Sequence, residues 1–142
     1  MTIAAILGGK GHEVVSVGTG TSVGAAVALL AERRIGAVPV VDGDAVVGVF
    51  SERDVIHCLA SDGAAALDRT VGDVMTAPAV TVEPRDGVLG ALSLMTRRRI
   101  RHLPVVDGGR MVGVVSIGDL VKYRIDRIEA DAAAMRDYIQ SA

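Results

Sequence analysis

RRIGAVPVVDGDAVVGVFSERD, residues 33–54, occurs a second time as RRIRHLPVVDGGRMVGVVSIGD, residues 98–119. The copies lie 65 residues apart (33 to 98), and 13 of their 22 aligned positions are identical. The similarity continues upstream at the same spacing, where VSV at 15–17 corresponds to VTV at 80–82. One repeat is often unable to bury its apolar face alone, so an internal repeat predicts units that pack on each other. We therefore expect a two-fold module with equivalent clefts between its halves.

Composition narrows the class of protein and of partner. Half of the 142 residues are hydrophobic and the net charge is only −2, which argues against a disordered chain and against a basic nucleic-acid binder. One Phe, two Tyr and no Trp leave no aromatic platform for stacking bases. A single cysteine, Cys58, excludes an intrachain disulfide and favours a reduced compartment. No apolar run approaches the ~20 residues of a membrane span. We expect a soluble, cytoplasmic protein that binds neither nucleic acid nor membrane.

Apolar periodicity and turn residues predict the same order of elements in both repeats: helix, strand, helix, strand, strand, helix. In the first repeat the expected elements are 2–7, 14–17, a helix from Thr21 or Ser22, 37–41, 46–50 and a helix from Ser51. In the second they are 70–75, 79–82, a helix from Asp86, 103–106, 111–115 and a helix from Ser116. Between the paired strands, Asp42-Gly43-Asp44 and Asp107-Gly108-Gly109 tolerate positive φ and predict hairpins.

This division makes residues 1–60 the first repeat, 61–69 a linker, 70–125 the second repeat and 126–142 a C-terminal helical extension. The composition of the linker predicts a mobile surface segment without a site of its own. The first repeat carries three extra residues near 8–11, where glycines surround Lys10. Such a segment can cradle a phosphate, but the full spacing of a P-loop is missing, so we favour a plain flexible connection.

The last helix carries a heptad-like apolar seam. Its members are Val121, Ile125, Ile128, Ala132, Met135 and Ile139. Charged residues cover the other faces, so the seam has to be buried against something. It can lie back on its own domain or pair with a second copy of the chain. We favour dimerisation, although fewer than three heptads do not decide the matter by periodicity alone.

The repeated VPVVD and GVFSERD, matched by LPVVD and GVVSIGD, resemble a CBS-domain pair, the module named after cystathionine β-synthase. The resemblance covers residues 2–125. It implies an α/β (α+β) fold of two tandem βαββα repeats, packed sheet to sheet with pseudo-two-fold symmetry, in a disc that often pairs into a homodimer. It also implies clefts that bind an adenosine ligand: AMP, ADP, ATP, NAD or S-adenosylmethionine. Most members of the family sense or regulate and catalyse no reaction.

The family motif assigns the ribose contacts to two pairs of residues, Ser51 with Asp54 and Ser116 with Asp119. The chemistry is sensible because an ionised carboxylate has two acceptor oxygens and a ribose offers two adjacent hydroxyl donors. The same pattern, [ST]-x-x-[DE] at a helix start, is also a capping box. The local sequence by itself favours the cap, whereas the full repeat favours ribose binding, and a serine can serve both.

In this family, prolines and their aliphatic neighbours form apolar walls for the adenine, which here points to Pro39 and Pro104; ordinary strand-edge prolines would look the same. The family also pairs the Ser/Asp of one repeat with the strand segment of the other. By that rule the cleft of Asp119 includes Ile35 and Gly36, the cleft of Asp54 includes Ile100 and Arg101, and Val17 and Thr81 line the edges.

Charge distinguishes the two clefts. The second repeat has Arg101 and His102 where the first has Gly36 and Ala37. In CBS relatives, basic residues at these positions reach the ligand's phosphates, a role that suits the donor fork of arginine. The neighbouring arginines are otherwise a solvated helix end, where cations are favourable. Arg53 can also reach a phosphate, and we expect the clefts to differ in affinity.

The case for catalysis is thin. His12, His57 and His102 lie in different predicted elements, and neither HExxH nor CxxC occurs. We therefore expect a regulatory protein that needs no metal or resident cofactor, and whose bound nucleotide changes a surface or an assembly read by another protein. Two rivals are a scaffold that keeps the fold without a ligand, acting through protein–protein contacts, and an enzyme such as a nucleotide hydrolase.

Overall fold

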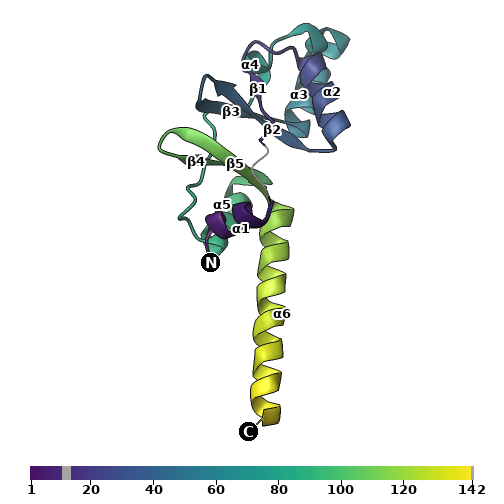
Figure 1. Ribbon diagram of the computed structural model, residues 1–142. Coiled ribbons are helices and arrows are strands. Elements are labelled where there is room, and N and C mark those ends of the chain that lie inside the picture. Colours follow the sequence, from purple (N-terminus) through teal and green to yellow (C-terminus); the bar gives the residue numbers. More distant parts are fainter. Residues whose placement is uncertain (11–13, 142) are drawn as a thin grey trace.

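The computed structural model describes residues 1–10 and 14–141. Two α/β halves lie against each other, and one long helix projects away from the second half (Figure 1). The helices are α1 Ile3–Lys10, α2 Val23–Arg33, α3 Glu52–Asp62, the 3₁₀ helix η1 Gly63–Asp68, α4 Val71–Val74, α5 Val88–Arg98 and α6 Ile117–Ser141. The strands are β1 Val17–Gly18, β2 Ala37–Asp42, β3 Ala45–Ser51, β4 His102–Asp107 and β5 Arg110–Ser116. The expected mixed fold of two similar halves with a C-terminal helix is confirmed.

The two sheets have matching hairpins. β2 pairs antiparallel with β3 and β4 with β5, each with a register irregularity at the equivalent place, and β1 adds a short parallel strand to β2. The predicted strand at 79–82 is wrong as a strand, because it is reduced to one parallel bridge between Val82 and Val105. Pro78 and Pro84 bracket this segment, and a proline has no N–H to extend a ladder.

Several turns and helix ends follow the local chemistry, but the start of α5 does not. Gly43 and Gly108 close the hairpins with φ of 63° and 60°, as predicted. Ser22 caps α2 by accepting the amide of Ala25 at 3.1 Å. Asp86 was expected to cap α5 and does not, because its carboxylate accepts the amide of Glu83 at 2.8 Å and closes the preceding turn.

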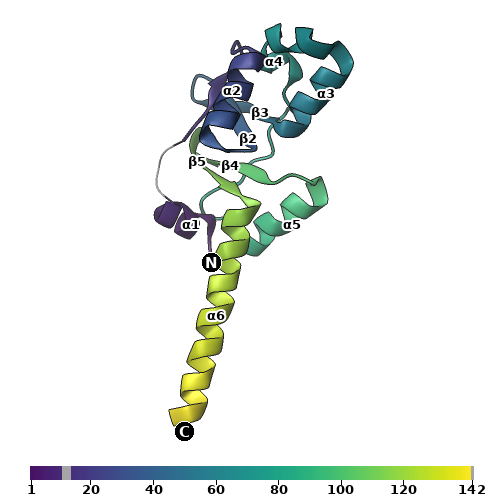
Figure 2. The same cartoon turned by 90° about the vertical axis from the view of Figure 1, so that its right-hand side faces the viewer.

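The first helix of each repeat packs into the core of the other repeat. In α1, Ile3, Ile6 and Leu7 are buried in the core built around α5, β4 and β5. In α4, Val71 is buried in the core built around α2, β2 and β3. Figure 2 shows α1 beside the start of α6 and α4 in the opposite half. The boundaries 1–60 and 70–125 therefore describe the sequence repeats. In the folded chain each hydrophobic core contains the first helix of the other repeat.

The linker is ordered, contrary to expectation. α3 continues to Asp62, and η1 follows at once. Ala66 is fully buried in the first core, and Arg69 donates to Asp62 at 2.8 Å. Small side chains let this segment approach α2 closely, since a Cβ placed on Gly24 would lie 3.3 Å from the carbonyl oxygen of Leu67. The rest of the segment is exposed, as predicted.

The halves meet sheet to sheet. An apolar crevice between the two hairpins has no room for a water molecule, and its walls come from both halves: Ala37, Val38, Pro39, Val49, His102, Pro104 and Val114. The pseudo-two-fold relation appears in the register, since Pro39 lies opposite Val49 and Pro104 opposite Val114. Dry, close packing of this kind makes the relative position of the halves sensitive to anything that enters between them.

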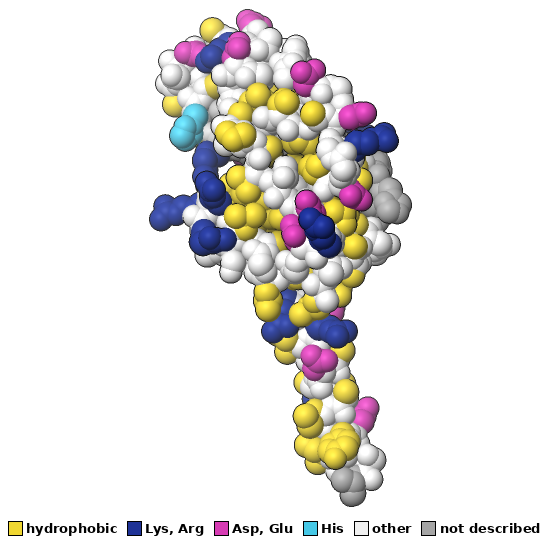
Figure 3. All heavy atoms as spheres, turned by 90° about the vertical axis from the view of Figure 1, so that its left-hand side faces the viewer, with side chains coloured by type: hydrophobic (Ala, Val, Ile, Leu, Met, Phe, Trp, Pro, Cys, Tyr) yellow, Lys and Arg dark blue, Asp and Glu magenta, His cyan; other side chains and the backbone are white. Residues whose placement is uncertain are grey.

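Only the first turns of α6 contact the second core, through Leu120 and Tyr123. Its seam residues Val121, Ile125, Ile128, Met135 and Ile139 are between 42% and 65% exposed. Figure 3 shows hydrophobic side chains along the projecting part of the helix. The helix does not lie back on its own domain. Within the described ranges, no helix combines the length and the apolar composition needed to cross a membrane.

Candidate functional site

Ser51 and Asp54 lie where β3 passes into α3. Ser51 ends the strand and caps the helix, and its hydroxyl accepts the amide of Asp54 at 3.5 Å. The carboxylate of Asp54 accepts the Ser51 amide at 2.9 Å and the Ser51 hydroxyl at 3.2 Å. The capping box is therefore formed, and the carboxylate stays half-buried beside the positive end of the helix.

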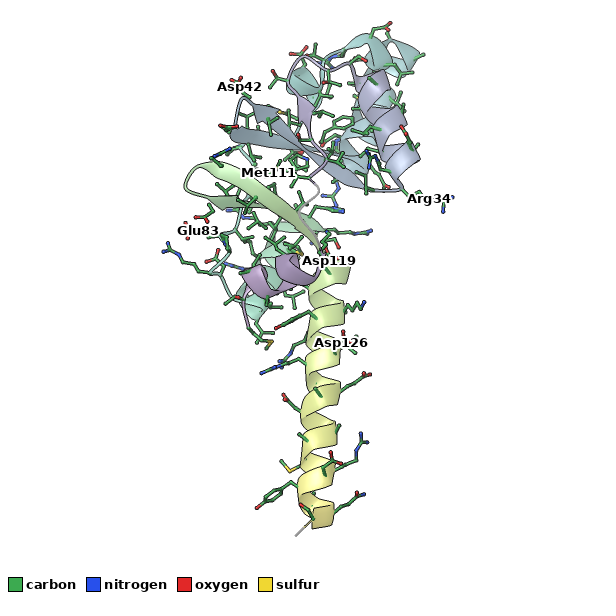
Figure 4. All side chains as sticks on the ribbon, viewed as in Figure 1. Arg34, Asp42, Glu83, Met111, Asp119 and Asp126 are labelled. Carbon is green, nitrogen blue, oxygen red and sulfur yellow. The ribbon has the colours of Figure 1, made fainter. Side chains whose placement is uncertain are left out.

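Ser116 and Asp119 repeat this arrangement where β5 passes into α6. The Asp119 carboxylate accepts the amide of Ser116 at 2.9 Å, and the Asp119 amide donates to the Ser116 hydroxyl at 3.1 Å. Figure 4 shows Asp119 at the start of α6, next to the end of α1. A cap holds one edge of each carboxylate and fixes its direction, which leaves the capping role compatible with ribose binding.

Each carboxylate has a further partner that sequence reasoning missed. The hydroxyl of Thr76, just after α4, donates to Asp54 Oδ1 at 2.8 Å. The ammonium of Lys10, at the end of α1, donates to Asp119 Oδ2 at 2.6 Å and to the carbonyl oxygen of Val114 at 2.9 Å. The segment expected to be a flexible connection is thus helical through Lys10, while Gly11 lies outside the described residues. The available signal was the three-residue insertion that carries this lysine.

The electrostatics of Asp119 follow from these contacts. Burial raises the pKa of its carboxyl. The hydrogen bond from Lys10, the amide of Ser116 and the charge of Lys10 act in the opposite direction and outweigh burial. The net pKa is held below the ordinary value, so Asp119 is an anion at neutral pH.

His102, at the start of β4, lies near the junction of the two halves. A Cβ built on Gly36 would be 3.5 Å from its Cε1 atom and 3.3 Å from Glu52 Oε1. Burial lowers the pKa of His102, the Lys10 ammonium lowers it further, and the carboxylates of Asp119 and Glu52 oppose this change. The structure thus brings Gly36 of the first repeat together with His102 of the second, near the charges of Lys10 and Asp119.

The other predicted residues occupy varied positions. Pro39 and Pro104 are buried and line the crevice between the sheets. Ile35 and Ile100 are half-buried, each directly after an arginine with left-handed φ that ends a helix, Arg34 at 54° and Arg99 at 55°. Val17 is buried in the first core. Among the residues predicted to bind the nucleotide, the three that are exposed are Arg53, Thr81 and Arg101.

Metal-ion chemistry finds no support in the part of the chain that the structure describes, which contains no group of three His, Cys, Asp or Glu residues able to hold a metal. His57 is exposed on α3, and His12 lies outside the described residues. The groups that can contact a ligand are two oriented carboxylates, apolar walls and nearby cations.

Known proteins are similar to this chain in both sequence and fold. The CBS domain family matches residues 11–61 and 71–126. The chain is 36% identical to the mitochondrial CBS domain-containing protein CBSX3 of Arabidopsis thaliana over 81% of its own length, and it spans 58% of that relative. Its fold matches the CBS-domain containing protein ATU1752 from Agrobacterium tumefaciens with a TM-score of 0.83 and 39% identity, over 87% of this chain and 99% of the other.

A further structural match is the CBS domain protein PAE2072 from Pyrobaculum aerophilum, which was solved in complex with AMP. It has a TM-score of 0.74 and 29% identity, over 84% of this chain and 89% of the other. Three observations point to two copies of one domain. They are the two segments matched by the family model, the internal sequence repeat, and the two hairpins related by a pseudo-two-fold axis. This chain belongs to the CBS domain family and carries two CBS domains.

Proposed function

We propose that this protein is a regulatory module that binds an adenine nucleotide in clefts around Asp54 and Asp119, and that it acts as a homodimer. The observation that carries the proposal is the pair of oriented carboxylates. Each is half-buried and held by a serine at a helix start. Such a carboxylate can accept both hydroxyls of a ribose.

The bound AMP of PAE2072 supports this choice of ligand class. Pro39 and Pro104 supply apolar surface from both halves, as an adenine ring requires. The crevice that they line has no room for water, so a base that reaches it has to part the sheets. Ligand binding is then coupled to the relative position of the halves, and a nucleotide that prefers one arrangement shifts the population toward it. The output is a surface or assembly change read by a protein effector, with no chemical step.

Thermal unfolding tests the ligand class directly. AMP, ADP, ATP, NAD and S-adenosylmethionine are each added far above the expected dissociation constant. A ligand at 100 times that constant stabilises the folded state by about 2.7 kcal/mol. Asp54→Asn and Asp119→Asn should each remove the contribution of one cleft, and Asp126→Asn, further along α6 (Figure 4), is the matched control. If no ligand shifts the melting curve, the protein is a scaffold that works through protein contacts.

The exposed seam of α6 supports the homodimer. A helix of 25 residues is about 37 Å long, and most of it extends beyond its own domain with an apolar face toward solvent. A second copy of this helix presents the same heptad spacing, so the two seams can pack against each other. We therefore assign the seam to a second copy of the chain rather than to an unrelated partner.

Sedimentation equilibrium tests the assignment. Ile128→Glu places a charge in the middle of the seam and should convert the dimer to a monomer. Ala130→Glu places the same charge on the opposite face of the helix and should leave the dimer intact. A wild-type protein that stays monomeric at high concentration would remove the proposal, and equal behaviour of the two variants would move the dimer contact away from α6.

A further inference from the structure

Lys10 gives the two clefts different charges. Its ammonium is 2.6 Å from Asp119 Oδ2, and the two side chains are 43% and 27% exposed, so solvent and a ligand can reach the ion pair. Lys10 enters from the far end of the chain, 109 positions before Asp119, because α1 packs into the second core.

Thr76 occupies the equivalent place in the first half. Its amide donates to the carbonyl oxygen of Val49 at 3.0 Å, and its hydroxyl donates to Asp54 at 2.8 Å. Val49 and Val114 are the same position in the two repeats, 65 residues apart (49 to 114). In the second half, the Lys10 ammonium contacts both the carbonyl oxygen of Val114 and the Asp119 carboxylate. In the first half, the amide and the hydroxyl of Thr76 make the two equivalent contacts. At this position the two sites therefore differ by one positive charge.

This charge interferes with ribose binding at Asp119. A carboxylate that accepts two ribose hydroxyls uses both of its oxygens. Oδ2 of Asp119 already accepts the amide of Ser116 and the ammonium of Lys10, which occupy its two lone pairs. The ribose therefore has to displace Lys10, while the capping amide stays in place. At Asp54 the corresponding oxygen, Oδ2, accepts the amide and the hydroxyl of Ser51, so the ribose displaces only a neutral hydroxyl there.

The fate of the displaced ammonium depends on the ligand. A neutral nucleoside takes the carboxylate and leaves the ammonium without an anion. A nucleoside phosphate brings its own anion, and the flexible four-carbon stem of a lysine lets the ammonium follow it. Other charges facing this space are Arg101, which also attracts a phosphate, and Glu52, which repels one.

We propose that Lys10 makes the Asp119 cleft selective for phosphorylated adenosine over the neutral nucleoside, by moving from the Asp119 carboxylate to the phosphate, whereas the Asp54 cleft has Thr76 in place of this lysine. The proposal rests on the proposed function, since it concerns the same nucleotide clefts. It gives the N-terminal helix a role in recognition, because the residue that reads the phosphate is the last residue of α1.

Titration calorimetry with adenosine and AMP tests the proposal, with Asp54→Asn present throughout so that only the Asp119 cleft binds. The unmodified lysine should favour AMP over adenosine by about tenfold or more, the effect of one charge-assisted contact. Lys10→Met should reduce this preference by about tenfold, by weakening AMP and strengthening adenosine. Lys10→Arg should retain the preference, and Lys122→Met on α6 is the matched control.

The outcomes separate this proposal from the one on which it rests. If Lys10→Met strengthens both ligands equally, the lysine only blocks the cleft and the proposal is overturned. If Lys10→Met changes neither the adenosine affinity nor the AMP affinity, Lys10 takes no part in ligand recognition and the proposal is wrong. If the wild-type protein, with both carboxylates intact, binds neither adenosine nor AMP, the nucleotide function falls and the selectivity falls with it. A circular dichroism spectrum and a melting curve for each variant establish that it is folded.

Discussion

Ile3→Ala is expected to destabilise the half of the protein that is distant from Ile3 in sequence. The side chain is fully buried and packs in one core with Met95, Leu103 and Leu120. Replacing a buried isoleucine by alanine costs about 2–5 kcal/mol, from the lost transfer free energy and from the cavity that remains. Because α1 is a short surface helix that can move to close part of the cavity, we expect a loss of about 3 kcal/mol.

Val71→Ala is the matched variant in the other half. Val71 is fully buried, is the second-repeat counterpart of Ile3, and packs in the first core with Phe50. The change removes two methylene-sized groups worth about 0.8 kcal/mol each, and a cavity term brings the expected loss to about 2 kcal/mol.

Urea denaturation gives the size of each loss, and amide hydrogen exchange gives its location. Beyond any uniform change from global unfolding, Ile3→Ala should speed exchange in β4 and β5, and Val71→Ala should speed exchange in β2 and β3. If Ile3→Ala instead speeds exchange in β2 and β3 and leaves β4 and β5 unchanged, α1 belongs to its own repeat and the exchange of helices is wrong.

Three further outcomes follow from local geometry. Gly48→Ala should cost about 1–3 kcal/mol of stability, because the new Cβ would lie 2.8 Å from a backbone carbonyl oxygen. Gly113→Ala should cost less, because its Cβ meets the flexible end of the Leu7 side chain. Equal urea midpoints for the two variants would contradict this difference. His102 has a folded-state pKa below its ordinary 6.5, so the unfolded chain binds more protons as the pH falls through that value and stability is lost on acidification. His102→Gln should therefore lose less stability than wild type between about pH 7.5 and pH 5, and parallel melting curves would refute the assignment. Ser116→Ala removes the hydroxyl that accepts a hydrogen bond from the Asp119 amide and should cost about 1 kcal/mol of stability; an unchanged melting temperature would contradict this capping role.

Residues that act over short sequence distances were predictable. Gly43 and Gly108 had to adopt positive φ for the strands on either side to pair, and Ser51 had to begin a helix after an apolar strand. Because the sequence is repeated, each of these local patterns occurs twice, and the second copy supports the interpretation of the first. The capping interpretation and the ribose interpretation of Asp54 both came from the same four-residue pattern; the structure confirms the cap, and ribose binding stays a prediction.

Contacts between distant segments were not predictable in the same way. Nothing near Lys10 in sequence indicates an ion pair with Asp119, because the contact exists only when α1 crosses to the second core. The linker was misjudged for a related reason: its alanines look like a loose surface segment until Ala66 is seen packed in the first core. The strand expected at 79–82 depended on a partner ladder that its flanking prolines prevent.

Local sequence patterns were enough to predict the two-fold repeat, the hairpins, the helix starts and the paired Ser/Asp residues, because turn conformation, capping and apolar periodicity act within a few residues. The core that each first helix enters, the partner that the Lys10 ammonium finds, and the exposure of the α6 seam to solvent follow from the three-dimensional fold alone. Two similar repeats have similar apolar faces, so either core suits either helix by composition. The choice depends on chain path and side-chain fit, which no local pattern encodes.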